Sequence, residues 1–401
     1  MEDSSKNSRL PGWYNLSLPE RGRQLAEWLS ESPAGLLSVM RSGGLSADQA
    51  DLLVENVVGV HALPFAVAPN FVVNGRQLLV PMVIEEPSVV AAAANAARIA
   101  RAGGGFRVSA SGPLMICQIQ LFVADGERAR GKILEAKTEL LADAARVDPL
   151  LVELGGGPVD IEVRNLKGGE GEAGFLVVHL LVSVLDAMGA NTVNTMGEAL
   201  VPRLEALSGG RVGVRILTNL ADRRTVTAEV SVPAAALELH GFDGEQVRDG
   251  IVSASRFAEL DPYRAATHNK GIMNGVDAVL LATGNDWRAV EAGAHAYAAR
   301  DGLYKPLCVW SREEDGRLRG KLKMPMAVGI VGGATRLHAG ARLALRIMGA
   351  DSAGELARVT AAVGMASNLA ALRALASEGI QKGHMRLHGR SRRKKPMSGR
   401  E

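Results

Sequence analysis

The sequence contains little cysteine and few aromatic residues. Two of its 401 residues are cysteine, and Phe, Trp and Tyr together make up 4% of the chain. Cys117 and Cys308 lie far apart among apolar residues, so we expect buried, reduced thiols rather than a disulfide. This composition excludes the small secreted folds that depend on a disulfide framework.

Long hydrophobic runs are also missing. The longest apolar run, Phe175 to Leu185, is interrupted by His179 and is far shorter than the roughly 20 residues that span a bilayer. The N-terminus, Met1 to Lys6, has no apolar segment of the kind found in a secretory signal peptide. Since 47% of the residues are apolar and 22% are charged, we expect a globular, cytoplasmic protein that does not contact membranes.

The net charge of +3 has a local origin. Residues 386–401 contain seven Lys or Arg residues and one Glu, a balance of +6 that leaves the remaining chain at −3. No aromatic residue interrupts the basic run Arg390 to Lys395. We therefore expect a solvated end rather than a nucleic-acid interface, and no nucleic acid as partner.

The spacing of apolar residues predicts an α+β fold. A chain of this length favours two domains. Its middle part has the pattern β-α-β-β-α-β, the split βαβ arrangement of ferredoxin-like domains. The predicted elements are a strand over 114–124, a helix over 127–146, strands over 159–166 and 175–185, a helix over 195–207 and a strand over 211–217.

The flanking sequence predicts helices over 270–282, 286–300 and 353–377. The simplest architecture is a large, mainly helical domain made of residues 1–108 and 222–376. The small ferredoxin-like domain, residues 109–221, is inserted between these two parts.

Two carboxylates precede a predicted helix near residue 86. Pro87 fits the first helical position, and an Ala-rich run from Val89 continues until Gly103. This pattern predicts Glu86 at the N-cap and Ser88 in the first turn. By itself the motif fits an ordinary capped helix as well as a catalytic carboxylate.

Four further segments favour the interpretation of Glu86 as a catalytic carboxylate. Together with the Glu86 motif they resemble the soluble, class II bacterial type of 3-hydroxy-3-methylglutaryl-CoA (HMG-CoA) reductase. The resemblance runs in one register from about Arg9 to about Arg390. The segments are Glu55 to Gly59, Asp186 to Glu198, Thr267 to Gly275 with Thr283 to Trp287, and Glu378 to Met385.

The resemblance implies that HMG-CoA and mevalonate plus CoA are interconverted by two hydride transfers, with four catalytic residues. Lys270 is expected to meet the negative charge that develops on the carbonyl oxygen, in a polar loop before an apolar helix. Glu86 is expected to donate or shuttle a proton, and Asp286 to orient Lys270. His384 is expected to protonate the departing CoA thiolate, since imidazole titrates near neutrality.

The resemblance also assigns the substrate pocket and the oligomeric state. Ser88, Arg264 and Asn274 match the residues that bind the acyl carboxylate, for which a guanidinium offers a bidentate fork. Members of the family are dimers with active sites at the subunit interface, so a homodimer is expected.

The predicted cofactor site is the turn from Asp186 to Thr195, between a strand and a helix. Its amides at Asn194 to Gly197 would face a pyrophosphate, although Asn194 also fits an ordinary N-cap. In the family this segment binds a nicotinamide dinucleotide, and the matching residues are Asp186, Met188 and Asn191. Asp148 matches the acidic residue on the adenine ribose, which favours NAD over NADP because a carboxylate repels a 2′-phosphate.

Two other patterns predict no site. Gly169 to Gly174 spells a dinucleotide fingerprint, but it leads into a strand and contains Glu170 and Glu172, which would repel phosphate. The histidines show no spacing with cysteine or acidic residues that is typical of metal ligands, so we predict no metal.

The C-terminus departs from the family pattern. Class II members continue for several dozen residues beyond the catalytic histidine and form a flap. Here Ser391 to Glu401 replaces that continuation, so residues 377–401 are expected to be a truncated flap with a basic tail. Two hypotheses follow: an active reductase that still delivers His384, or a catalytically impaired dimer that binds NAD and CoA ligands.

Overall fold

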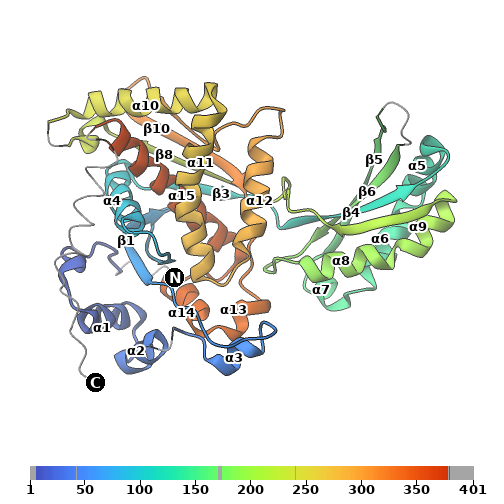
Figure 1. The fold of residues 1–401 in the computed structure, drawn as a ribbon, viewed down its shortest axis with the longest axis horizontal. Helices are drawn as coiled ribbons and strands as arrows, with labels where there is room; N and C mark the ends of the chain where they lie inside the picture. The colour runs from blue at the N-terminus through green and yellow to red at the C-terminus, as the bar shows by residue number, and fades with distance from the viewer. Residues whose placement is uncertain (1–5, 42, 170–173, 240, 378, 380–401) are drawn as a thin grey trace.

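The computed structural model describes residues 6–41, 43–169, 174–239, 241–377 and 379. Figure 1 shows two units side by side. The large unit contains the N-terminal segment and the C-terminal half of the described chain, and the small unit projects from it. Among the described residues, every helix is too short or too polar to cross a membrane.

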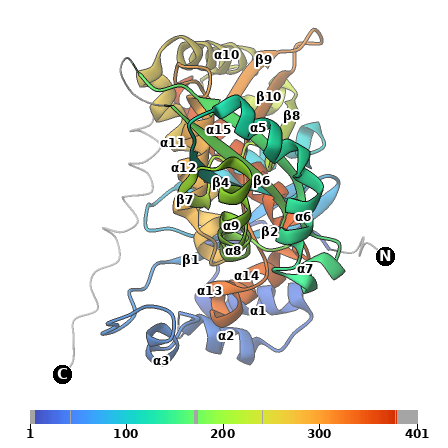
Figure 2. The same ribbon diagram turned by 90° about the vertical axis from the view of Figure 1, so that its right-hand side faces the viewer.

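The small unit is a four-stranded antiparallel sheet with helices on one face (Figure 2). The strand order is β5-β6-β4-β7, so the pattern β-α-β-β-α-β is confirmed and gives the split βαβ topology. Its elements are β4 (Leu114–Phe122), α5 (Gly126–Glu135), α6 (Lys137–Ala145), α7 (Pro149–Glu153), β5 (Gly157–Leu166), β6 (Phe175–Ser183), α8 (Ala190–Ala199), α9 (Val201–Ser208) and β7 (Arg211–Leu217).

Alternation along the strands separates the two faces of this sheet. Cys117 and Ile119 of β4, and Val178 and Leu180 of β6, are buried in a core beneath the helices. The second predicted helix is divided at Leu200, where Pro202 removes the amide that would continue the helical ladder. The turn before β6 overlaps residues 170–173, which lie outside the described chain, and Gly174 does lead into a strand.

The large unit contains two sheets in addition to its helices. A hairpin of β1 (Phe65–Val73) and β2 (Arg76–Val83) lies beside a four-stranded sheet of order β3-β8-β10-β9. Its strands are β3 (Arg107–Ala110), β8 (Thr225–Val232), β9 (Cys308–Arg312) and β10 (Leu318–Pro325). These strands were not predicted from the sequence.

The helices of the large unit surround the long central helices α11 and α15. The helices are α1 (Leu18–Leu29), α2 (Pro33–Arg41), α3 (Ala47–Asp51), α4 (Val89–Ala100), α10 (Gly244–Leu260), α11 (Pro262–Ala282), α12 (Trp287–Ala298), α13 (Gly333–Leu337), α14 (Ala339–Met348) and α15 (Ala353–Leu375).

Glycines allow α11 and α15 to pack closely. A Cβ on Gly275 would lie 2.4 Å from Oγ of Ser367, and one on Gly364 would lie 2.8 Å from Cγ2 of Val276. Both distances are too short for a side chain. The position of α11 in the core is therefore tightly constrained.

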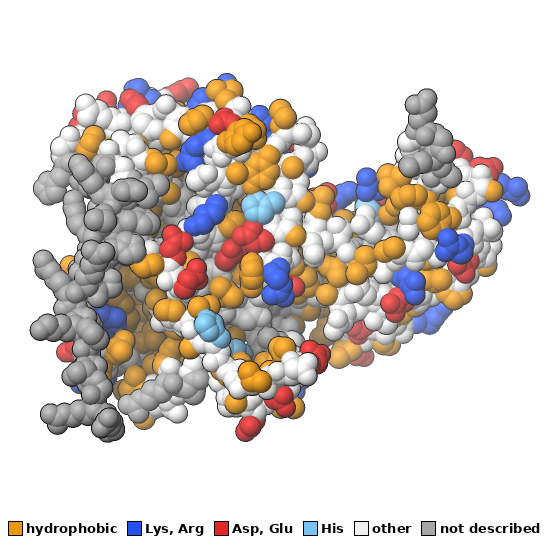
Figure 3. All heavy atoms as spheres, in the orientation of Figure 1, with side chains coloured by type: hydrophobic (Ala, Val, Ile, Leu, Met, Phe, Trp, Pro, Cys, Tyr) orange, Lys and Arg blue, Asp and Glu red, His pale blue; other side chains and the backbone are white. Residues whose placement is uncertain are grey.

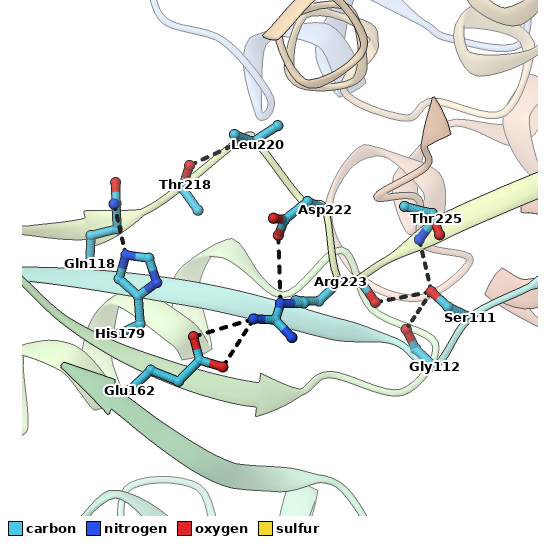
Figure 4. Close-up of polar contacts among 10 residues, drawn as sticks. All are labelled: Ser111, Gly112, Gln118, Glu162, His179, Thr218, Leu220, Asp222, Arg223 and Thr225. Carbon is cyan, nitrogen blue, oxygen red and sulfur yellow. Dashed lines mark hydrogen bonds and ion pairs between the residues drawn. The ribbon is translucent and has the colours of Figure 1, made fainter. Parts of the chain in front are cut away.

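Two neighbouring strands carry the chain into and out of the small unit. β3 precedes it and β8 follows it, and the two pair antiparallel. Oγ of Ser111 donates to the carbonyl oxygen of Arg223 (3.0 Å) and accepts from the amide of Thr225 (2.8 Å). Figure 4 also shows the guanidinium of Arg223 on the carboxylate of Glu162, 3.0 Å away on the open face of the small sheet. The two connections are therefore joined to each other and to that sheet.

Candidate active site

The structure brings Glu86 and Lys270 together from distant parts of the sequence. Nζ of Lys270 lies 3.1 Å from Oε2 of Glu86. The two side chains are 61% and 36% exposed, so solvent screens the pair and its contribution to stability is small. A carboxylate and an ammonium thus face solvent-accessible space, where a ligand can reach both.

The backbone before α4 differs from the prediction. The helix begins at Val89 with Ser88 as its N-cap, so Glu86 is not the N-cap and Pro87 is not the first helical residue. Ser88 has φ of 82°, a left-handed conformation that is strained for a residue with a side chain. Its Oγ is buried and lacks a hydrogen-bond partner among the described residues. A strained turn therefore holds a free hydroxyl two residues after Glu86.

The sequence predicted Lys270 in a polar loop before a helix. In the structure it lies in the middle of α11. Asn274 follows one turn later on the same face of the helix. Arg264 is six residues before Lys270, which places it roughly 120° around the helix axis, and partial burial lowers its pKa. Arg264 and Lys270 therefore lie on different faces of α11 within this chain.

Two polar residues beside Lys270 hold α11 in place. Nε2 of His268 donates to the carbonyl oxygen of Cys308 (2.9 Å), and burial lowers the pKa of His268 to about 4, which keeps the ring neutral. The side chain of Asn269 donates to the carbonyl oxygen of Lys305 and accepts from the amide of Leu307, each at 2.9 Å. These residues fix the helix to the segment that leads into β9.

Asp286 is at a helix start, as predicted. It caps α12, where its Oδ1 accepts from the amide of Ala289 at 3.1 Å and lies 3.5 Å from the guanidinium of Arg288. Within the described part of this chain, the contacts of Asp286 do not include Lys270. The structure thus pairs Lys270 with Glu86 and leaves Asp286 at a separate position.

The predicted cofactor turn is joined to the large unit. Oδ1 of Asp186 accepts a hydrogen bond from the amide of Ala353, at the start of α15, over 2.8 Å. The amide of Gly329 donates to Oδ1 of Asn285 (2.8 Å), and a Cβ at Gly329 would lie 2.6 Å from the amide nitrogen of Met188. Gly329, in the segment after β10, thus contacts both the cofactor turn and the loop that leads into Asp286.

Arg224 supports the same turn and was missed in the sequence. Its buried guanidinium donates to the carbonyl oxygens of Ala187 and Val328. Burial lowers the pKa of Arg224 to about 10, which leaves it charged near neutrality, and Asp186 opposes this shift. Its sequence neighbours, Arg223 and Thr225, give no sign of this burial.

The helix after the turn starts earlier than predicted. α8 begins at Ala190 with Gly189 as N-cap, so the amides of Asn194 to Gly197 lie inside the helix. The side chain of Asn194 accepts from the amide of Leu217 at 2.8 Å and so joins α8 to β7 rather than capping the helix. The unpaired amides belong to the first turn, which contains the exposed Asn191.

Asp148 lies next to this first turn. It caps α7, where its Oδ1 accepts from the amide of Leu151 at 3.0 Å. Its Oδ2 accepts from Oγ1 of Thr192, on α8, at 3.4 Å. Asp148 is therefore joined to Thr192, the residue after Asn191, although the two are 44 positions apart in the sequence.

A cavity of about 2020 Å³ opens beside Glu86 and Ser88. Much of its wall is apolar and comes from the N-terminal segment and α4. Further lining residues, which sequence analysis had not singled out, are cationic: Arg9, Arg21, Arg98 and Arg101. Their spacing in sequence gives no sign that they meet. Tyr14 also lines the cavity, and His384 lies outside the described residues.

Comparison with known proteins agrees with this geometry. The family model described as hydroxymethylglutaryl-coenzyme A reductase matches residues 18–389. The 3-hydroxy-3-methylglutaryl-coenzyme A reductase of Archaeoglobus fulgidus is 50% identical, over 96% of this chain and 86% of that protein. A probable reductase of Borreliella burgdorferi is 35% identical, over 84% of this chain and 76% of its own length.

Solved structures give the same result. The reductase of Streptococcus pneumoniae superposes with a TM-score of 0.88 and 44% sequence identity, over 92% of this chain and 99% of that chain. A second structure of the class II enzyme from this organism, bound to NADPH in open conformations, has the same TM-score and identity. The fold, the joined Glu86 and Lys270, and these matches lead to one conclusion: the chain belongs to the hydroxymethylglutaryl-coenzyme A reductase family.

Proposed function

We propose that this protein interconverts HMG-CoA and mevalonate plus CoA in two hydride transfers that use NAD(H). The observation that supports this most directly is the ion pair of Lys270 and Glu86 beside the unpartnered hydroxyl of Ser88, at the edge of the large cavity. A positive charge on Lys270, a carboxyl group that can exchange a proton on Glu86, and space for a ligand lie together at this place.

Each reduction step places negative charge on an oxygen that was a carbonyl. The ammonium of Lys270 stabilises that oxyanion. Glu86, 3.1 Å from this ammonium, is positioned to exchange the proton that converts the oxyanion into a hydroxyl. His384 would protonate the CoA thiolate as the half-reduced thioester breaks down.

The residues around the turn after β6 fit a nicotinamide dinucleotide, which supplies the hydride when bound. The first turn of α8 offers unpaired amides for a pyrophosphate, with Met188 and Asn191 beside them. The carboxylate of Asp186 is already bonded to the start of α15, so its role is to hold the turn in place. Asp286 lies close to the turn through Asn285 and Gly329.

We further propose that NAD is preferred over NADP. Asp148 adjoins the first turn of α8, and its carboxylate would accept hydrogen bonds from a ribose 2′-hydroxyl and repel a 2′-phosphate. The structure from S. pneumoniae that contains NADPH concerns that protein.

The substrate would occupy the cavity beside α4. Its acyl carboxylate would meet Ser88, Asn274 and Arg264, and the CoA phosphates would meet the arginines of the cavity wall. Since Arg264 and Asp286 lie apart from Lys270 within one chain, we propose that a second copy completes the site in a cytoplasmic homodimer. The catalytically impaired dimer that binds NAD and CoA ligands remains the alternative hypothesis.

The test uses purified protein with mevalonate and CoA, and follows the absorbance of the reduced cofactor. We expect NADH to form, and NADPH to form much more slowly from NADP. Equal rates with the two cofactors would contradict the assignment of Asp148. Absence of turnover, with CoA binding intact by calorimetry, would favour the impaired alternative.

A further inference from the structure

Titratable side chains of α12 and of the segment that follows it contact one another in series. Oε2 of Glu291 is 2.6 Å from Nε2 of His295, and Nδ1 of His295 is 2.7 Å from Oη of Tyr304. The rings of His295 and Tyr304 stack with their centroids 5.9 Å apart. Figure 3 shows acidic and histidine side chains close together over α11 and α12 on this face of the molecule.

Asp277 of α11 extends this chain to a second helix. Its carboxyl group forms a hydrogen bond with the carboxyl group of Glu291. One oxygen of this carboxyl group, Oδ1, is buried and has no hydrogen-bond partner among the described residues. Two carboxyl groups in contact need a proton between them, because two negative charges would repel each other at that distance.

The surroundings indicate which carboxyl group carries the proton. His295 holds the pKa of Glu291 below its usual range, and Glu291 in turn raises the pKa of His295. Burial, then the contact with Glu291, raises the pKa of Asp277 to about 8. Near neutrality Asp277 is therefore the protonated donor and Glu291 the charged acceptor.

The charges that act on this network come from its own members. The groups that act on Asp277, Glu291 and His295 are members of the network itself, from α11 and α12. Strand β10 also packs against α12, but it contributes the uncharged, buried side chains of Leu322 and Met324 to the shared core.

The chain of contacts returns to α11 beside Lys270. Tyr304 accepts a hydrogen bond from the side chain of Asn269, the residue before Lys270. Asp277, at the other end, is seven residues after Lys270 and lies on the same face of α11. The contacts therefore bracket Lys270 from both sides and join its helix to α12, which Asp286 begins.

We propose that Asp277, Glu291, His295 and Tyr304 form a positioning network that holds α11 against α12 and so fixes the position of Lys270 on α11, with one proton shared by the two carboxyl groups. The catalytic part of this proposal rests on the proposed function. The network places two carboxyl groups in contact. Burying apolar side chains at these positions would cost less free energy than burying two carboxyl groups. A specific role for the proton explains the arrangement.

The kinetic test compares Asp277→Asn with Asp277→Ala in the full-length protein. Asn keeps a neutral donor to Glu291, so we expect kcat near pH 7 to stay within about twofold of the parent. Ala removes the donor and should lower kcat roughly tenfold or more with KM little changed, because Lys270 loses its alignment rather than its contact with the substrate. Glu314→Gln, an exposed acid elsewhere, is the matched control.

The pH profile distinguishes this role from simple packing. In the parent, kcat should fall above about pH 8 as Asp277 ionises, and the Asp277→Asn variant should lose that fall. Parallel profiles in parent and variant would overturn the proposal, as would equal losses of kcat in the Asn and Ala variants.

An activity-independent measurement separates this proposal from the proposed function. Infrared difference spectra near neutral pH should show the carbonyl band of a protonated carboxyl group in the parent and in Glu314→Gln, and no such band in Asp277→Asn. If the parent lacks turnover but shows this band, the proposed function fails and the shared proton stands. If the band is absent from the parent, the network proposal is wrong, whatever the activity.

Discussion

The carboxylate of Asp186 and the amide of Ala353 are joined by a 2.8 Å hydrogen bond although 167 positions separate them in the sequence. Asp186 follows the last strand before α8, and Ala353 is the first residue of α15. A carboxylate at a helix N-terminus is favoured by both the unpaired amide and the helix dipole. The turn proposed to bind the cofactor is thus attached to the longest helix of the large unit.

Replacing Asp186 by Ala should weaken this attachment. We expect the free energy of unfolding to fall by about 1–2 kcal/mol, because a charge-assisted hydrogen bond is lost at a partly buried site. The KM for the dinucleotide should rise while kcat changes less. Urea unfolding and steady-state kinetics measure these effects, and an unchanged KM would show that the turn keeps its shape without the bond.

Replacing Lys270 by Ala should abolish most of the turnover without unfolding the protein. The side chain is 61% exposed, so we expect the stability to change by no more than about 0.5 kcal/mol. Loss of oxyanion stabilisation should lower kcat by about 10²-fold or more. Lys270→Arg is the control, because it keeps the positive charge but replaces the ammonium with a guanidinium of different shape. Normal turnover by the Ala variant would remove Lys270 from the mechanism.

The replacement Asp148→Ala should narrow the preference for NAD over NADP. Without the carboxylate, the repulsion of a 2′-phosphate and the hydrogen bonds to a ribose hydroxyl are both lost. The ratio of kcat/KM for the two cofactors is the measurement. Thr192→Val removes the neighbouring hydroxyl but keeps the charge, and should leave most of the preference. A preference that survives Asp148→Ala would have to arise elsewhere.

The raised pKa of Asp277 predicts a pH dependence of stability. Its pKa is about 8 in the folded state against 3.8 as the ordinary value, so between these limits the folded protein binds more protons than the unfolded chain. The contribution of Asp277 to the free energy of unfolding therefore decreases as pH rises from about 4 to about 8.

Asp277→Asn cannot titrate and should lack this decrease. Relative to the parent, the variant should gain stability steadily between about pH 5 and about pH 8, as measured by urea unfolding at several pH values. His295, whose pKa is raised by Glu291, adds stability that is lost above its folded pKa in both proteins. A constant difference between parent and variant would show that Asp277 is ionised throughout.

The sequence was most informative where local periodicity decides the structure. The alternation along residues 114–122 and 175–183 and the helical spacing between them were enough to predict the β-α-β-β-α-β unit, because one face of each strand is buried. In the large unit, buried residues alternate with half-buried ones along β8 and with exposed ones along most of β10, but only helices were predicted there.

The details of the site depended on effects that local patterns do not encode. Pro87 and Ser88 were expected to open a helix, but the left-handed backbone of Ser88 delays it to Val89. Asn194 also fitted an ordinary N-cap in the sequence, but its side chain accepts a hydrogen bond from the amide of Leu217 instead. The contact of Asp277 with Glu291 is set by how α11 and α12 cross, which sequence spacing cannot reveal. The resemblance to the family supplied residue roles that periodicity alone could not.

The paired connections at Ser111 and Arg223 also determine how the small unit can move. A single connecting strand would allow it to swivel in any direction. Two connections that run side by side and are bonded to each other resist twisting of the small unit, and the bond between Asp186 and Ala353 opposes its swinging away from the large unit. A dinucleotide bound at the turn, as proposed, would therefore keep one orientation toward the large unit.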